Sequence, residues 1–179
     1  MGSEGRGEQL LKTDQDNALL LSDELDCPEL PAIAERFNAA LASFGYPTCP
    51  GNIMVTNPLW RQPLTAFRAT ITDWLLGSDP EGPMHLAIFM DAHTVCGDAR
   101  LLEEVQRGLM TLATDNDAVL ARFASAIEAF GNSTGWWNRL LGLGELDQHL
   151  NLKKEGIFPL VHGVRSLALS RRVAATGTA

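Results

Sequence analysis

Residues 2–17 read G-S-E-G-R-G-E-Q-L-L-K-T-D-Q-D-N, and the apolar run Leu19–Leu21 follows shortly after them. Three glycines within residues 2–7 predict a turn or loop at the start of this stretch. The alternating acidic residues that lead into the apolar run predict a strand over residues 14–22. Because side chains two positions apart on a strand share one face, we expect Asp14 and Asp16 to lie side by side.

Two adjacent carboxylates suit a divalent cation, since Mg²⁺ is held by one or two carboxylates together with substrate phosphates. The glycine-rich stretch ahead of them offers backbone N–H groups and the Ser3 hydroxyl to phosphate oxygens. Arg6 adds a planar guanidinium that matches a phosphate group. Together these parts predict phosphoryl or nucleotidyl transfer, in which the protein acts by positioning and charge neutralisation. An Asp-x-Asp sequence alone is more often a solvated turn.

The composition excludes several classes of protein. Fourteen Lys and Arg stand against 22 Asp and Glu, a net charge of −8, which argues against a general binder of nucleic acid or of anionic membranes. No apolar run reaches the ~18 residues typical of a membrane span, and the N-terminus lacks the apolar core of a signal peptide. Three cysteines without a CxxC spacing favour reduced thiols. We therefore expect a soluble cytoplasmic protein.

The rest of the chain predicts an α+β fold. A second short strand is expected over residues 53–56. Hydrophobic periodicity predicts helices over residues 32–44, 63–76, 83–95, 99–113, 114–130 and 159–173, although 83–95 also fits a strand. The first of these helices has an apolar face of Ile33, Phe37, Ala40, Leu41 and Phe44. The composition shifts near residue 77, which predicts a small mixed sheet in residues 1–76 and a helical bundle in residues 77–179.

The spacing of Gly5-Arg6-Gly7-Glu8 and Thr13-Asp14-Gln15-Asp16 resembles the signature of the DNA polymerase beta superfamily of nucleotidyltransferases. It is closer to PII uridylyltransferases and glutamine synthetase adenylyltransferases, and closest to a bacterial family of nucleotidyltransferase domains found with CBS pairs and cyclic-nucleotide-binding domains. The further segments that carry this resemblance are Cys49-Pro50-Gly51, Asn57-Pro58-Leu59-Trp60-Arg61, Phe89-Met90-Asp91, Gly97-Asp98, Leu152-Lys153-Lys154 and Arg165. The resemblance spans essentially the whole chain.

The sequence departs from the superfamily pattern in two ways. The strand that usually precedes the Gly-Ser loop is missing, and the C-terminal tail looks cut, so we expect truncation at both ends. The superfamily also supplies a third carboxylate from a later strand, and Asn57 ends the corresponding stretch here. Asn can coordinate a metal but cannot act as a general base. Asp91 lies in an apolar segment, where a buried, hydrogen-bonded carboxylate is expected.

The resemblance implies an enzyme that moves a nucleoside monophosphate from an NTP to a hydroxyl on a protein or small molecule. Asp14 and Asp16 would hold Mg²⁺ or Mn²⁺, and Gly2, Ser3 and Arg6 would hold the triphosphate. The helical half, residues 77–179, would bind the acceptor substrate. Regulatory CBS or cyclic-nucleotide-binding domains are implied partners, whereas nucleic acid and membranes are not.

Several alternatives stay open. Arg61 suits either a phosphate or a surface ion pair. Lys153, Lys154 and Arg165 suit either a solvated surface or a position facing the nucleotide, and Lys153 is taken as a nucleotide ligand. The chain could instead be a catalytically weak NTP sensor within a signalling protein, which the missing third carboxylate favours. A helical interaction domain with a vestigial site is a third reading, and it rests on the acidic charge alone.

Overall fold

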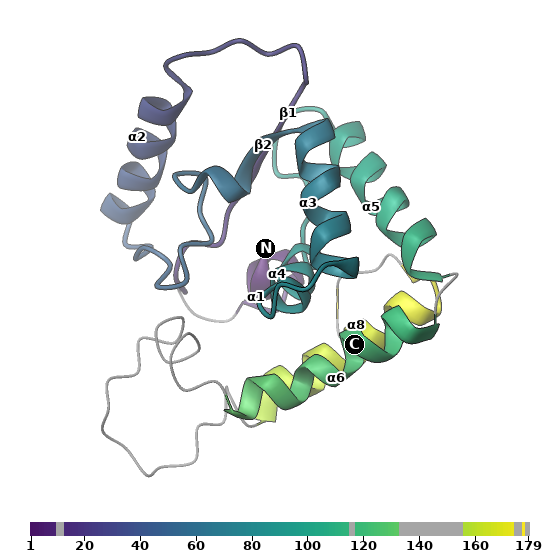
Figure 1. Ribbon diagram of the computed structural model, residues 1–179. Helices are drawn as coiled ribbons and strands as arrows, with labels where there is room; N and C mark the ends of the chain where they lie inside the picture. Colours follow the sequence, from purple (N-terminus) through teal and green to yellow (C-terminus); the bar gives the residue numbers. More distant parts are fainter. Residues whose placement is uncertain (10–12, 115–116, 133–155, 174–176, 178–179) are drawn as a thin grey trace.

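The computed structural model describes residues 1–9, 13–114, 117–132, 156–173 and 177. These form a mostly helical structure with one small sheet, so the α+β expectation is confirmed (Figure 1). The elements are α1 (Gly2–Gly5), β1 (Leu19–Leu21), α2 (Leu30–Ser43), the 3₁₀ helix η1 (Pro58–Trp60), β2 (Arg61–Pro63), α3 (Leu64–Leu76), α4 (Gly82–Phe89), α5 (Ala99–Thr114), α6 (Asp117–Asn132) and α8 (Phe158–Ser170).

The sheet has two parallel strands, with Leu19 opposite Arg61 and Leu21 opposite Pro63. The strand expected at residues 53–56 is wrong, because this segment forms bends and turns that lead into η1. Asn57 begins η1, and its side-chain oxygen accepts a hydrogen bond from Leu59 N at 3.0 Å. A proline at the first position of η1 needs no hydrogen-bond partner, which stabilises this turn over an extended chain. The second strand therefore begins at Arg61.

The first strand is shorter than expected, because ladder pairing covers only Leu19–Leu21. The preceding residues are extended but pair with loops. Gln15 N donates to Pro47 O at 2.9 Å, and Asn17 N donates to Ile53 O at 3.0 Å. Residues 13–18 thus run along the loop of residues 47–53 instead of along a neighbouring strand.

Most helices expected from periodicity are present with small shifts at their ends. The ambiguous segment 83–95 is helical only over Gly82–Phe89, and turn and loop residues follow. Asp98 begins α5 as expected, since its carboxylate accepts a hydrogen bond from Arg100 N at 3.0 Å. No helix in the described part of the chain is both long enough and apolar enough to cross a membrane.

The turn or loop expected at residues 2–7 is a single helical turn. Gly5 N donates to Met1 O at 3.0 Å, and Glu8 N donates to Ser3 O at 2.9 Å. Gly7, with φ of +69°, ends the turn in a conformation that favours glycine. The glycines therefore serve the close packing and the exit of a helical turn, and of the two expected alternatives the turn is present.

The prediction that the apolar face of α2 is buried is also wrong. Ile33, Phe37 and Phe44 are 44%, 47% and 66% exposed, whereas Ala34 and Asn38 are 3% and 4% exposed. The reason is a polar contact: the buried Gln15 side chain donates to the carbonyls of Asn38 at 3.1 Å and Tyr46 at 2.8 Å. This contact fixes the Asn38 side of α2 against residues 13–18.

The core lies where α3 packs against α4 and α5, and it extends to α6 and α8. Trp60 and Trp74 lie in this core with ring centroids 5.1 Å apart, as expected, while Trp136 and Trp137 lie outside the described residues. Helices α6 and α8 run side by side along one end of the molecule (Figure 1). Buried contacts thus join the segments on both sides of residue 77, and the division into two domains at that point stays a prediction.

Candidate functional site

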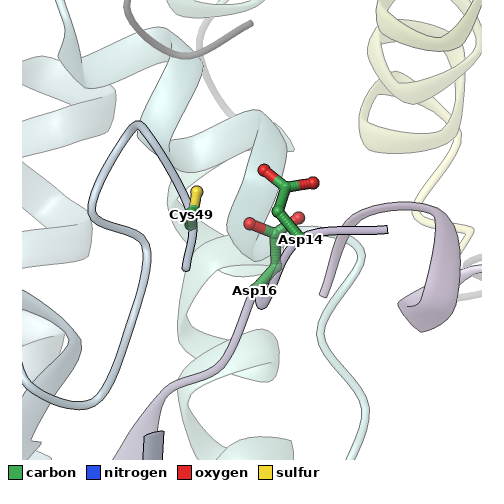
Figure 2. Close-up of side chains that lie close together, drawn as sticks. All are labelled: Asp14, Asp16 and Cys49. Carbon is green, nitrogen blue, oxygen red and sulfur yellow. The ribbon is translucent and has the colours of Figure 1, made fainter. Parts of the chain in front are cut away.

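Asp14 and Asp16 lie on the extended segment that leads into β1, with their carboxylates close together (Figure 2). The residue between them, Gln15, points the other way and is 4% exposed. The Gln15 side-chain amide donates hydrogen bonds to the carbonyl oxygens of Asn38 and Tyr46, and these bonds hold Gln15 on one side of the extended chain. Because side chains alternate along such a segment, Asp14 and Asp16 both lie on the opposite side. A buried glutamine thus orients the acidic pair, a role that the sequence pattern alone did not reveal.

Cys49 is the third member of this group. One ligand atom each from Asp14, Asp16 and Cys49 lies within 4.8 Å of the other two. Cys49 is 4% exposed, and burial, followed by the negative charge of Asp16, raises the pKa of its thiol to about 12. The thiol is therefore protonated at neutral pH. The sequence does not reveal that the Cys49-Pro50-Gly51 segment lies at the site, because no local spacing links it to Asp14 and Asp16.

The donor set fits a hard divalent cation. Mg²⁺ takes oxygen ligands, commonly one or two carboxylates, and completes its shell with phosphate oxygens and water. Asp14 and Asp16 offer the carboxylates, and they are only half-buried, so solvent reaches them. A protonated thiol adds no charge to this set. The two aspartates, and not Cys49, are therefore the residues that would hold Mg²⁺ or Mn²⁺.

Gly2 lies directly against this pair. A β-carbon added to Gly2 would be 2.6 Å from Asp16 Oδ2, and Gly2 has a φ of +59°. Both facts require glycine at this position. The contact brings the helical turn α1, with Ser3 next in the chain, to the side of the carboxylate pair.

Arg6 does not point to an open phosphate cradle. Its Nη1 donates to Asp91 Oδ2 at 2.6 Å, and its Nε donates to Glu8 Oε2 at 2.7 Å. Asp91 also accepts from Arg165, with Arg165 Nε 2.9 Å from Asp91 Oδ1 and a second contact from Nη2 to Oδ2. Arg6 thus enters a cluster with Glu8 and Arg165 around the buried Asp91, which we call the Asp91 cluster.

The Asp91 cluster balances two positive against two negative side chains. Asp91 is 1% exposed on its side chain, as expected for a buried, hydrogen-bonded carboxylate, and the side chains of Arg6 and Arg165 are 10% and 14% exposed. Burial acts to lower the pKa of Arg6, but Glu8 and Asp91 outweigh it and leave that pKa raised. Burial lowers the pKa of Arg165, and Asp91 offsets part of that effect. The solvated-surface alternative for Arg165 is therefore wrong.

The remaining expected ligands lie elsewhere. Arg61 Nη1 donates to the carbonyl oxygens of Val55 at 2.5 Å and Thr56 at 3.3 Å, so its guanidinium supports the turn ahead of η1. Lys153 and Lys154 lie outside the described residues. Of the expected site residues, the structure therefore brings together Asp14, Asp16 and Gly2, and it directs Arg6 and Arg61 to other partners.

Two family matches account for most of the chain. Residues 1–81 match the family described as "Putative nucleotidyltransferase DUF294", and residues 117–179 match the family described as "Putative nucleotidyltransferase substrate binding domain". The chain therefore contains a segment that matches each of these two families. Comparisons with curated proteins and with solved structures gave no match.

The family matches divide the site as follows. The nucleotidyltransferase match contains Asp14, Asp16, Cys49 and the α1 turn, and the substrate-binding match contains α6 and α8. Asp91 lies between the two matched ranges and contacts both, through Arg6 on one side and Arg165 on the other. The Asp91 cluster therefore connects the nucleotidyltransferase part of the family to its substrate-binding part.

Proposed function

We propose that the chain binds an NTP with Mg²⁺ or Mn²⁺ and transfers its nucleoside monophosphate to a hydroxyl on a protein or small molecule. One observation carries the proposal: two carboxylates, Asp14 and Asp16, lie together beside the Gly2–Gly5 turn within a matched nucleotidyltransferase segment. The activity would resemble that of PII uridylyltransferases. The resemblance to nucleotidyltransferase domains found with CBS pairs supports a signalling protein with CBS or cyclic-nucleotide-binding domains as partners, and three cysteines without a CxxC spacing support a cytoplasmic location.

In the proposed reaction, the acceptor hydroxyl oxygen attacks the α-phosphorus of the NTP. A bond forms from the hydroxyl oxygen to the α-phosphorus, and the bond from the α-phosphorus to the bridging oxygen breaks. Pyrophosphate leaves, and the hydroxyl proton passes to solvent. When bound, the divalent cation neutralises phosphate charge and orients the triphosphate. Asp14 and Asp16 would hold it, Gln15 keeps both carboxylates on one side, and Gly2 lets the α1 turn approach Asp16 more closely than a residue with a side chain could.

The remaining candidate residues either contact the nucleotide or support the turn beside it. Ser3 offers a hydroxyl to the triphosphate from the α1 turn, and Lys153 and Arg61 are secondary candidates. Arg6 acts from within its ion pair with Asp91, since its guanidinium is already bonded to two carboxylates. Its role is to hold the turn that carries Gly2 and Ser3. Helices α6 and α8 supply the acceptor side.

The test is a transfer assay with α-labelled ATP, UTP, GTP and CTP in the presence of Mg²⁺ or Mn²⁺ and cell extract. The expected result is label on a protein band or on a small molecule, lost in Asp14→Asn. Asp26→Asn is the matched control, since Asp26 is exposed and the charge change is the same. Label that is equally strong with Asp14→Asn would contradict the proposal.

A second candidate is an NTP sensor with little or no transfer activity. One observation favours it: the third side chain beside Asp14 and Asp16 is a buried thiol and not a carboxylate, so among the described residues this group holds no third acidic base. Saturable, cation-dependent NTP binding by the parent chain, with no label transferred to any acceptor, would select the sensor over the enzyme.

A further inference from the structure

The third side chain beside the two carboxylates is a thiol, that of Cys49. Cys49 Sγ and a carboxylate oxygen from each of Asp14 and Asp16 lie within 4.8 Å of one another, and the thiol comes from a different loop (Figure 2). Cys49 is 4% exposed, so its sulfur is sheltered from bulk solvent. The site therefore combines two hard oxygen donors with one soft sulfur donor.

The backbone fixes the place of this sulfur. Pro47 O accepts from Gln15 N at 2.9 Å, and Ile53 O accepts from Asn17 N at 3.0 Å, so the loop is tied to residues 13–18 on both sides of Cys49. Within the loop, Cys49 O accepts from Asn52 N at 2.9 Å. Because these bonds alternate with Asp14 and Asp16 along the chain, the thiol and the carboxylates are held in register by the same contacts.

The two kinds of donor favour different cations. Mg²⁺ and Mn²⁺ prefer carboxylate, phosphate and water oxygens, whereas Zn²⁺ and Co²⁺ also bind thiolate sulfur and form sites with three protein ligands and one open position. A cation that uses only Asp14 and Asp16 depends on NTP oxygens to complete its shell. A cation that also uses Cys49 has three protein ligands before any nucleotide arrives.

This step rests on the proposed function, which assigns a divalent cation to Asp14 and Asp16. We infer that Cys49 sets the cation preference of the site and makes it bind thiophilic cations such as Zn²⁺ in competition with Mg²⁺-NTP. With Mg²⁺ or Mn²⁺ the thiol keeps its proton. With Zn²⁺ or Co²⁺ the S–H bond breaks, a metal–sulfur bond forms, and the proton passes to solvent. Thiophilic cations therefore bind without nucleotide and prevent Mg²⁺-NTP from binding to Asp14 and Asp16.

The test is a Co²⁺ titration of the 179-residue chain followed by absorption spectroscopy. A thiolate-to-cobalt charge-transfer band is expected in the near ultraviolet without nucleotide. It should be removed by Zn²⁺, kept in excess Mg²⁺, and lost in Cys49→Ser. The variant Cys27→Ser with Cys96→Ser is the matched control and should keep the band, since both thiols lie outside the three-residue group. No band in the parent chain, or loss of the band in the control, would overturn the inference.

A parallel titration with Mn²⁺ and ATP or UTP separates this inference from the proposed function. Zn²⁺ should inhibit Mn²⁺-NTP binding strongly in the parent and much less in Cys49→Ser, with each protein compared with itself in the absence of Zn²⁺. Mn²⁺-NTP binding with no cobalt–sulfur band would overturn the role of Cys49 alone. A cobalt–sulfur band with no Mn²⁺-NTP binding would overturn the proposed function and leave Cys49 as a metal ligand. Equal Zn²⁺ inhibition of parent and Cys49→Ser would again overturn the role of Cys49.

Discussion

Arg6 and Asp91 lie 85 residues apart in the chain and form a buried ion pair, with Arg6 Nη1 2.6 Å from Asp91 Oδ2. Arg165 binds the same carboxylate from α8. The arginine that the glycine-rich motif offers to phosphate is thus part of the contact between the N-terminal turn and the substrate-binding helices. Any change in this contact reaches both the α1 turn, which packs on Asp16, and α8.

Replacing Asp91 tests the energetic weight of this cluster. Asp91→Ala leaves two buried guanidinium groups without their shared carboxylate, and we expect a loss of about 3–5 kcal/mol in the free energy of unfolding. Urea unfolding followed by circular dichroism measures it. The control is Glu104→Gln, which breaks the exposed pair with Arg68 and should cost less than ~1 kcal/mol. Equal losses in the free energy of unfolding for the two variants would show that the Asp91 cluster does not stabilise the fold more than an exposed ion pair does.

The close packing of the α1 turn against the backbone of Asp91 gives a second prediction. A β-carbon at Gly5 would lie 2.0 Å from Asp91 O, so Gly5→Ala must displace the turn, at a cost of about 1–3 kcal/mol. Gly108, inside α5, has no atom within 4 Å of an added β-carbon. Gly108→Ala should therefore stabilise the protein by about 1 kcal/mol through helix propensity. Thermal melts of both variants measure the contrast, and a shift of the same sign in both would contradict the packing described.

The buried His162 predicts a dependence of stability on pH. Its Nε2 donates to Phe123 O at 2.7 Å. Burial lowers the pKa of His162, and the charge of Arg165 lowers it further, although the Phe123 carbonyl partly offsets both. The unfolded chain therefore binds a proton first, near the usual histidine pKa of about 6.5. The stability contributed at neutral pH is lost as the pH falls below that value.

Urea unfolding at pH 7.5 and at pH 5.5 measures this dependence. We expect the parent chain to be less stable at the lower pH and His162→Gln to show a smaller difference between the two. Burial lowers the pKa of His85 as well, so some dependence should remain in that variant. His93 is exposed, and His93→Gln should behave as the parent does. An unchanged pH difference in His162→Gln would refute the assignment.

Local patterns predicted those parts of the molecule that local forces determine. Hydrophobic periodicity found α3 and α5 almost to the residue, and alternation put Asp14 and Asp16 on one side. Periodicity failed at α2, because its apolar stripe is exposed and a buried glutamine bonds to the other face. One polar contact from a distant residue thus decided which face of the helix was buried.

The long-range contacts of the site were beyond sequence patterns. Cys49 reaches the carboxylates because backbone bonds tie its loop to residues 13–18, and no spacing encodes this. The pairing of Arg6 with Asp91 depends on how α4 meets the N-terminal turn. In both cases the residues were noticed in the sequence, but their partners depend on tertiary packing.

Calorimetric titration of ATP and UTP into the chain with Mn²⁺, for the parent, Asp14→Asn and Asp26→Asn, tests whether the two carboxylates hold the cation. We expect Mn²⁺-dependent binding by the parent and by Asp26→Asn, and none by Asp14→Asn. Removing one of two adjacent carboxylates relieves repulsion, so the melting temperature of Asp14→Asn should hold or rise. Binding of Mn²⁺-NTP by a folded Asp14→Asn with the affinity of the parent would contradict the claim that this pair holds the cation.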